Sequence, residues 1–351
     1  MKKKSYDAVD LAKWICAWLV MYIHLAPVFP SIPLLDDMLC SSICRVAVPF
    51  FFAVSSFFLF QKMDPSNPTG PANRKLLVQF CGRLFSLYIF WIVVYNLYTL
   101  FYRNYNDMPQ KTLQETLLGV FFSGDVLPLW YLMASIYAAP AVFLLWSRGR
   151  KGLLAGCLIF ELLSLLDWPY PLIPIFKNSA MRWCFKEMSL VVNAVLSGIP
   201  LMCLGGLCLT DHRKRPSRQW GLATLCLLLL LVVETAGVYA YYGQRFRSAL
   251  LGMGVTRLPL TYCLVNWLLS ADFKLPVKWL GKAFRLSSTW FYCMHWLMWS
   301  LYSWVFAYDG TVRYLAVGCL TTISGIPYVA FKLLRHRKTP VTPTVLAEEH
   351  T

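Results

Sequence analysis

Apolar residues dominate the chain in blocks of roughly 20, and short polar stretches separate these blocks. A helix of about 20 apolar residues crosses the roughly 30 Å of hydrocarbon in a bilayer, so each block predicts one membrane span. We expect about ten spans, with approximate limits 8–26, 39–60, 76–102, 129–146, 153–168, 189–210, 220–242, 249–270, 286–308 and 312–334. The sequence therefore predicts an all-α protein, a polytopic integral membrane bundle of about ten transmembrane helices.

Charged residues alternate between the loops in a way that predicts orientation. Basic residues cluster before the first span, at 61–75, 148–151, 212–218 and 274–285, and after Lys332. The loops between them carry Asp36, Asp37, Glu115, Asp125, Asp167 and Asp309. Lys and Arg collect on the cytoplasmic side, so both termini are expected to be cytoplasmic. We expect one membrane domain at 1–335 and a flexible cytoplasmic tail at 336–351, in a multi-pass protein of the cell membrane.

Composition narrows the function classes. Of the 351 residues, 58% are hydrophobic and 14% are charged, too few polar residues for a soluble domain. The net charge of +16 follows the alternate loops, so we expect no nucleic-acid partner. The 12 cysteines occur singly and form no C-x-x-C pair, so no metal is expected, and only Cys40 and Cys44 are a pair to check for a disulfide. The basic N-terminus precedes a polar-interrupted apolar run, which indicates an uncleaved first span.

The first span holds three ionisable residues, which are functional candidates because charge is costly at membrane depth. Lys13 and His24 lie about 20° apart on one helix face and roughly 16 Å apart along the axis, with Asp10 close to the same stripe. The pattern indicates a polar cavity. The alternative is that Lys13 extends to the interface and His24 bonds a neighbouring helix.

The second span runs inward, so Arg45 is expected in the outer half of the membrane near the depth of His24, with Ser55 and Ser56 near Lys13. Pro49 can kink this helix. Facing lipid, Arg45 would cost roughly 2.5 to 3.5 kcal/mol, so it must face the bundle. Its partner there is either a carboxylate such as Glu161 or a polar group of a bound substrate.

These residues resemble membrane acyltransferase family 3. The resemblance rests on the basic-x10-His pattern of the first span, R-x-A-V-P-x-F-F-x-x-S-[GS] from Arg45, Arg83, the Leu-Trp-Tyr-Leu at 129–132, and Tyr-Cys-Met-His ending at His295. Residues 10–25 and 45–59 look most similar to the membrane half of membrane-bound serine racemases and their stand-alone relatives. Lys13 stands where the family usually has Arg, and Ser55-Ser56 where it has Ser-Gly.

The resemblance implies an acyltransferase that moves an acyl group, most often acetyl, from cytoplasmic acyl-CoA to a hydroxyl of a sugar or cell-envelope glycan. Acetyl-CoA would be the donor and no metal is needed. His24 would be the general base, with Asp10 and Arg45 beside it in the catalytic site, and a covalent acetyl-histidine is the less favoured route. Residues expected on the donor side are Lys13, Ser55, Ser56, Arg74, Lys75 and Arg83.

The acceptor side is expected to involve Trp130, Tyr131, Glu161 and His295. Trp130 and Tyr131 are expected at the outer interface, where they either stack on a sugar ring or belong to the usual aromatic belt. His295 either joins the cavity of His24 or only packs between helices. The expected partners are thus the bilayer, acyl-CoA and a glycan or small hydroxyl acceptor. The alternative function is a permease or serine-uptake domain, because a polar cavity between helices suits transport equally well.

Overall fold

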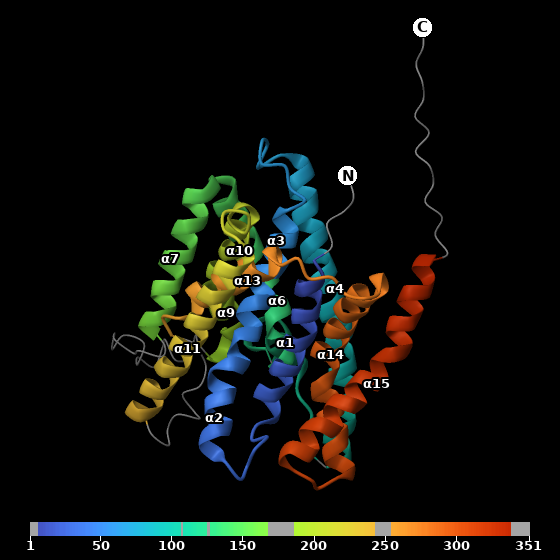
Figure 1. Ribbon diagram of the computed structural model, residues 1–351. Coiled ribbons are helices and arrows are strands. Elements are labelled where there is room, and N and C mark those ends of the chain that lie inside the picture. Colours follow the sequence, from blue (N-terminus) through green and yellow to red (C-terminus); the bar gives the residue numbers. More distant parts are fainter. Residues whose placement is uncertain (1–5, 107, 125–126, 168–185, 243–253, 338–351) are drawn as a thin grey trace.

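The computed structural model describes residues 6–106, 108–124, 127–167, 186–242 and 254–337, and all regular elements in these ranges are helices (Figure 1). The α-helices are α1 (Asp7–Leu25), α2 (Pro33–Ser41), α3 (Ala47–Phe60), α4 (Pro71–Tyr105), α5 (Leu113–Leu118), α6 (Trp130–Ser147), α7 (Gly149–Asp167), α9 (Ser189–Asn193), α10 (Ile199–Asp211), α11 (Ser217–Tyr242), α13 (Arg257–Ser270), α14 (Lys278–Val305) and α15 (Gly310–Arg337). Short 3-10 or π segments join some of them: η1 (Ile43–Val46), η2 (Gly119–Ser123), η3 (Leu127–Leu129) and η5 (Ala194–Gly198).

The helices confirm the predicted all-α polytopic bundle. Seven described segments are long and apolar enough to cross a membrane: Asp7–Leu25, Pro33–Phe60, Pro71–Tyr105, Trp130–Ser147, Ser189–Asp211, Ser217–Tyr241 and Gly310–Arg335. Helices α7, α13 and α14 are more polar or shorter, and they run beside these segments in the same bundle (Figure 1). The count of ten spans and the cytoplasmic placement of the termini stay predictions. The first turn of α1 and the last turn of α15 lie at the same end of the bundle, here called the inner end (Figure 1).

Helix boundaries follow the apolar blocks closely. The predicted spans at 8–26, 129–146 and 220–242 differ by at most a few residues from α1, α6 and α11. The predicted second span is broken: a 3-10 segment follows Ser42, and Pro49 falls in the first turn of α3, where its missing N–H removes no helical bond. The start of the predicted span at 249–270 lies partly outside the described residues.

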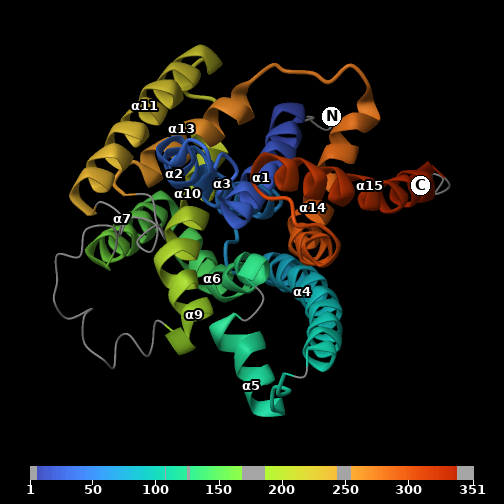
Figure 2. The same cartoon turned by 90° about the horizontal axis from the view of Figure 1, so that it is seen from below.

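Helices α1, α3 and α10 occupy the centre of the bundle, while α4, α11 and α15 lie at its edge (Figure 2). In the most apolar window of the Pro33–Phe60 segment 67% of residues are buried, against 17% for α11 and 22% for α15, so the outer helices present their apolar side chains to lipid. Gly205 lets α10 approach α3 closely, because a Cβ there would lie 2.0 Å from the Ala53 carbonyl oxygen.

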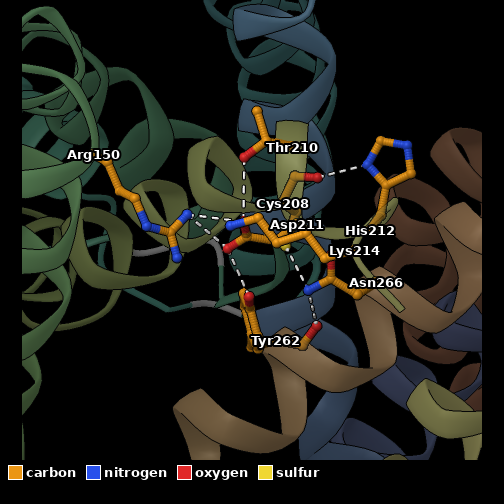
Figure 3. Close-up of polar contacts among 8 residues, drawn as sticks. All are labelled: Arg150, Cys208, Thr210, Asp211, His212, Lys214, Tyr262 and Asn266. Carbon is orange, nitrogen blue, oxygen red and sulfur yellow. Dashed lines mark hydrogen bonds and ion pairs between the residues drawn. The ribbon is translucent and has the colours of Figure 1, made fainter. Parts of the chain in front are cut away.

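A polar joint holds three helices together near the inner end (Figure 3). The Asp211 side chain, 1% exposed at the end of α10, accepts hydrogen bonds from Arg150 Nη1 at 2.8 Å and from the Tyr262 hydroxyl at 2.7 Å, and it lies 2.6 Å from Lys214 Nζ. Arg150 belongs to α7 and Tyr262 to α13. The buried carboxylate therefore fixes α7, α10 and α13 relative to one another.

Candidate functional site

A cavity of about 1440 Å³ opens at the inner end between α1, α3, α4 and α14. Its polar lining comes from all four helices and their flanks: Tyr6, Asp10, Lys13, Ser55, Gln61, Lys62, Gln79, Arg83, Ser86 and Arg285. Four of these side chains are basic and one is a carboxylate. The excess of positive charge favours an anionic ligand over a cationic one in this cavity.

Asp10 and Lys13 lie side by side on the wall of this cavity. Lys13 Nζ is 4.0 Å from Asp10 and 4.7 Å from the centre of the Phe58 ring, so the ammonium group is held between a carboxylate and an aromatic face. Arg285 of α14 lies 3.8 Å from the other Asp10 oxygen. Asp10 is thus an anchor for two cations, and the predicted polar stripe of the first span does line a cavity over its inner part.

The other residues predicted for the donor side are divided by the structure. Ser55 and Arg83 line the cavity, and Arg83 donates from Nε to the Gln79 carbonyl of its own helix at 3.2 Å. Arg74 and Lys75 are exposed in the first turn of α4 and are not among the lining residues. Ser56 is fully buried against α10, and its hydroxyl donates to the Ala53 carbonyl at 3.0 Å.

A second polar group lies further along α1, toward the outer end of the bundle. The His24 and His295 rings are stacked with centroids 5.4 Å apart, and the Trp296 ring packs edge-on against His24 at 5.5 Å. His295 is fully buried, with Nδ1 3.1 Å from the Phe291 carbonyl oxygen. Among the described residues its Nε2 has no hydrogen-bond partner. The two histidines predicted from separate motifs therefore form one pair.

Arg45 completes this outer group. It lies in η1, which packs against α1, the helix that carries His24. Within the described part of the chain, the buried Arg45 Nε has no hydrogen-bond partner. A buried guanidinium N–H without a hydrogen-bond partner is available to donate to a negative charge that develops nearby.

Of the two alternatives expected for Arg45, pairing with Glu161 is wrong. Glu161 of α7 receives a bidentate contact from Arg257 of α13, whose Nε lies 3.1 Å from both carboxylate oxygens. Arg257 also donates to the Ser197 hydroxyl at 3.2 Å and the Leu196 carbonyl at 3.0 Å. The Glu161 side chain is thus occupied by a buried ion pair, and an acceptor-binding role for it stays only a prediction.

Tyr131 is a buried residue of the bundle. It is 7% exposed, because α6 begins inside the bundle, directly after the fully buried Leu129. Its hydroxyl lies 2.7 Å from the Ser55 hydroxyl and donates to the Phe51 carbonyl at 3.1 Å. Trp130 is half-buried and its ring lies 6.0 Å from that of Phe52. Both aromatic residues therefore pack on α3, and the sugar-stacking and interfacial roles expected for them stay predictions.

The outer end of α1 is fixed by residues that sequence motifs did not reveal. One Asp36 oxygen accepts from the Tyr22 hydroxyl at 2.7 Å and from the backbone N–H groups of Val28 and Phe29 at 2.8 and 3.0 Å. Arg313 of α15 donates to the Leu25 carbonyl at 2.8 Å. These contacts hold the helix end that carries His24. Asp36 and Arg313 were visible in the sequence as charged residues near the ends of predicted spans, but their contacts with the end of α1 were not.

Cys40 and Cys44 are both buried and free, so they form no disulfide. They pack with Tyr22 and Val28 near the outer end of α1. The pair contributes apolar packing next to Arg45.

Comparisons with known proteins bear on the whole chain. A family model described as an acyltransferase domain matches residues 6–330. Similar curated proteins include an amino-acid racemase of Enterococcus faecalis, 26% identical over 76% of this chain and 36% of its own length, and a serine/alanine racemase of Enterococcus gallinarum, 24% identical over 84% of this chain and 40% of its own. The chain thus spans two fifths or less of the length of these relatives. No solved structure matches it significantly.

Proposed function

Because this chain belongs to the acyltransferase family whose model covers residues 6–330, we propose that it is a membrane O-acyltransferase. The donor would be cytoplasmic acyl-CoA, most simply acetyl-CoA, and the acceptor a hydroxyl of a sugar or cell-envelope glycan. One observation carries the proposal: the basic cavity at the inner end and the stacked pair of His24 and His295 are both built on the same helix, α1.

The inner cavity supports the donor side of the proposal. Coenzyme A carries several phosphate charges, and the cavity sets Lys13, Lys62, Arg83 and Arg285 against a single carboxylate. Its volume of about 1440 Å³ exceeds the roughly 300 to 1,000 Å³ of ordinary small-molecule pockets, as a ligand of this size requires. If α1 starts in the cytoplasm, as the loop charges predict, the cavity faces the compartment that holds acyl-CoA.

The histidine pair supports the chemistry. In the proposed reaction the acceptor oxygen attacks the thioester carbonyl carbon, a new C–O bond forms and the C–S bond breaks. His24 takes the proton from the acceptor hydroxyl and returns it to the departing thiolate, so the products are the ester and coenzyme A. Arg45 would stabilise the negative charge on the carbonyl oxygen during attack. His295 holds the His24 ring in place by stacking at 5.4 Å.

The second candidate is a permease for an amino acid, kept because relatives of this chain are named amino-acid racemase and serine/alanine racemase. Those names describe proteins more than twice as long as the part that matches. The rings of Phe51, Tyr131 and Tyr292 pack between the cavity and the histidine pair, so transport and acyl transfer would both require this layer to rearrange.

A doubly labelled donor separates the two candidates. Protein reconstituted in vesicles is incubated with coenzyme A labelled in its acetyl group and, with a second isotope, in its adenosine, together with glycan from the source envelope. The transferase predicts acetyl label without adenosine label in the glycan. No label in the glycan together with counterflow of radiolabelled serine would establish the permease instead.

A further inference from the structure

The inner cavity and the outer histidine pair are separated by a layer of three aromatic side chains. Phe51 of α3 and Tyr131 of α6 contact each other with ring centroids 6.0 Å apart, and Tyr292 of α14 lies 6.1 Å from Phe51 and 5.9 Å from Tyr131. The Tyr292 ring in turn lies 6.5 Å from His295. The layer is therefore continuous from the floor of the cavity to the histidine pair.

Ser55 marks the place where the cavity meets this layer. Its side chain lines the cavity, and its hydroxyl forms a 2.7 Å hydrogen bond with the Tyr131 hydroxyl just behind it. The Tyr131 ring is enclosed by Phe51, Phe52 and Tyr292. Its hydroxyl contacts the cavity-lining Ser55, which links Tyr131 to the donor side of the site.

The hydrogen bond from Tyr131 to the Phe51 carbonyl can be lost at little cost in free energy. Phe51 lies in the middle of α3, where its carbonyl already accepts the helical N–H four residues later. Loss of the bond from Tyr131 leaves that carbonyl satisfied, and the cost is small because no buried acceptor is stranded. The Tyr131 hydroxyl can therefore turn its proton to another carbonyl that enters from the cavity.

We infer that the Ser55 and Tyr131 hydroxyls bind the thioester carbonyl of the acyl donor at the floor of the cavity, with Tyr131 as the hydrogen-bond donor. This inference rests on the proposed function and names the place where the acyl end of the donor is recognised. Binding there loosens Tyr131 from Phe51, in the one layer that separates the thioester from His24. Free coenzyme A has a thiol in place of the carbonyl and cannot accept this hydrogen bond.

The test compares the affinities of acetyl-CoA and free coenzyme A by titration calorimetry on the full chain in lipid nanodiscs. The variants are Tyr131→Phe and Ser55→Ala, with Tyr137→Phe as the matched control. Tyr137 is also in α6, and its hydroxyl donates to a backbone carbonyl, that of Phe121, at 2.7 Å; unlike Ser55, the partner of Tyr131, Phe121 does not line the cavity. Each substitution removes one hydroxyl from a packed side chain.

In Tyr131→Phe we expect acetyl-CoA to bind roughly 3- to 10-fold more weakly, the worth of one neutral hydrogen bond, while free coenzyme A binds within about 2-fold of the unmodified protein. Ser55→Ala should give a smaller change of the same kind, and Tyr137→Phe no change for either ligand. Equal changes for both ligands in Tyr131→Phe would overturn the inference and leave the proposed function standing. Failure of the unmodified protein to bind either ligand would overturn both.

Discussion

Removal of the Glu161 carboxylate tests whether this residue holds the fold together or binds a substrate. Glu161 and Arg257 have side chains 8% and 7% exposed, and they form a bidentate ion pair between α7 and α13. Each lies about 18 to 20 Å from the inner end of its helix, at 1.5 Å per residue. The Glu161→Ala variant leaves the Arg257 guanidinium buried with only the Ser197 hydroxyl and the Leu196 carbonyl as acceptors.

The expected loss can be estimated from general values. A buried charge that loses its partner costs about 3 to 5 kcal/mol, and an arginine at membrane depth costs roughly 2.5 to 3.5 kcal/mol on insertion scales. Because two neutral acceptors remain, we expect about 3 kcal/mol of the free energy of unfolding to be lost. The control is Glu115→Ala, which removes an exposed capping carboxylate from α5 and should cost only about 1 kcal/mol.

The assay is thermal unfolding in detergent for Glu161→Ala, for Arg257→Leu and for the double variant. The double variant removes both charges and should recover most of the loss seen in each single variant. Acyl transfer per folded molecule should be unchanged in the double variant. If Glu161→Ala were as stable as the unmodified protein, or if the double variant were no better than the single ones, the structural role assigned to this pair would be wrong.

Three further predictions concern Arg83, Arg45 and Asp36. Arg83→Ala should weaken the binding of coenzyme A more than the binding of its dephosphorylated analogue, as measured by calorimetry. Arg74→Ala, on the exposed first turn of α4, should change the binding of neither ligand. Equal losses of affinity in the two variants would argue against a specific phosphate contact. Arg45→Lys and Arg45→Ala should fold normally but lose acyl transfer, because lysine cannot reproduce the planar geometry of the guanidinium. Normal turnover by a folded Arg45→Ala protein would exclude Arg45 from the site. Asp36→Ala should lower the transfer rate at unchanged donor affinity, because the Asp36 contacts fix the end of α1. Asp36→Asn should keep most of the rate, since its amide oxygen still accepts hydrogen bonds. Equal rates in the two variants would contradict this positioning role.

The sequence predicted the helices well because each span is a local property of one apolar block. The stripe of Asp10 and Lys13 was also predictable, since helical spacing alone places both on one face. The helical spacing of residues along α4 was equally predictable. Arg83 lies on the same helix face as Gln79 and Ser86, whereas Arg74 lies about 180° around the helix axis. Which face of α4 meets the cavity depends on the neighbouring helices. Arg74, Lys75 and Arg83 therefore looked equivalent before the structure.

Contacts between distant segments could not be predicted. Glu161 stood out in the sequence as a charge inside a predicted span, but Arg257 was not singled out, and only the packing of α7 and α13 in the bundle decides that the two pair. Tyr131 looked interfacial because it opens an apolar block, and its burial depends on where α6 begins within the bundle. His24 and His295 were each predicted near mid-depth, and the packing of α1 against α14 brings them together.

The central claim is that His24 is the base for acyl transfer at a site supplied from the inner cavity. The most direct measurement is the rate of label transfer from acetyl-CoA to the envelope acceptor by His24→Ala, compared with His212→Ala. His212 serves as the control because it is a buried histidine at the inner end that does not line the cavity. Its Nδ1 lies 2.7 Å from the Cys208 carbonyl oxygen. The account predicts a loss of at least about 100-fold for His24→Ala with donor affinity unchanged, and near-normal transfer per folded molecule for His212→Ala. Transfer by His24→Ala within a few-fold of the unmodified protein would contradict it.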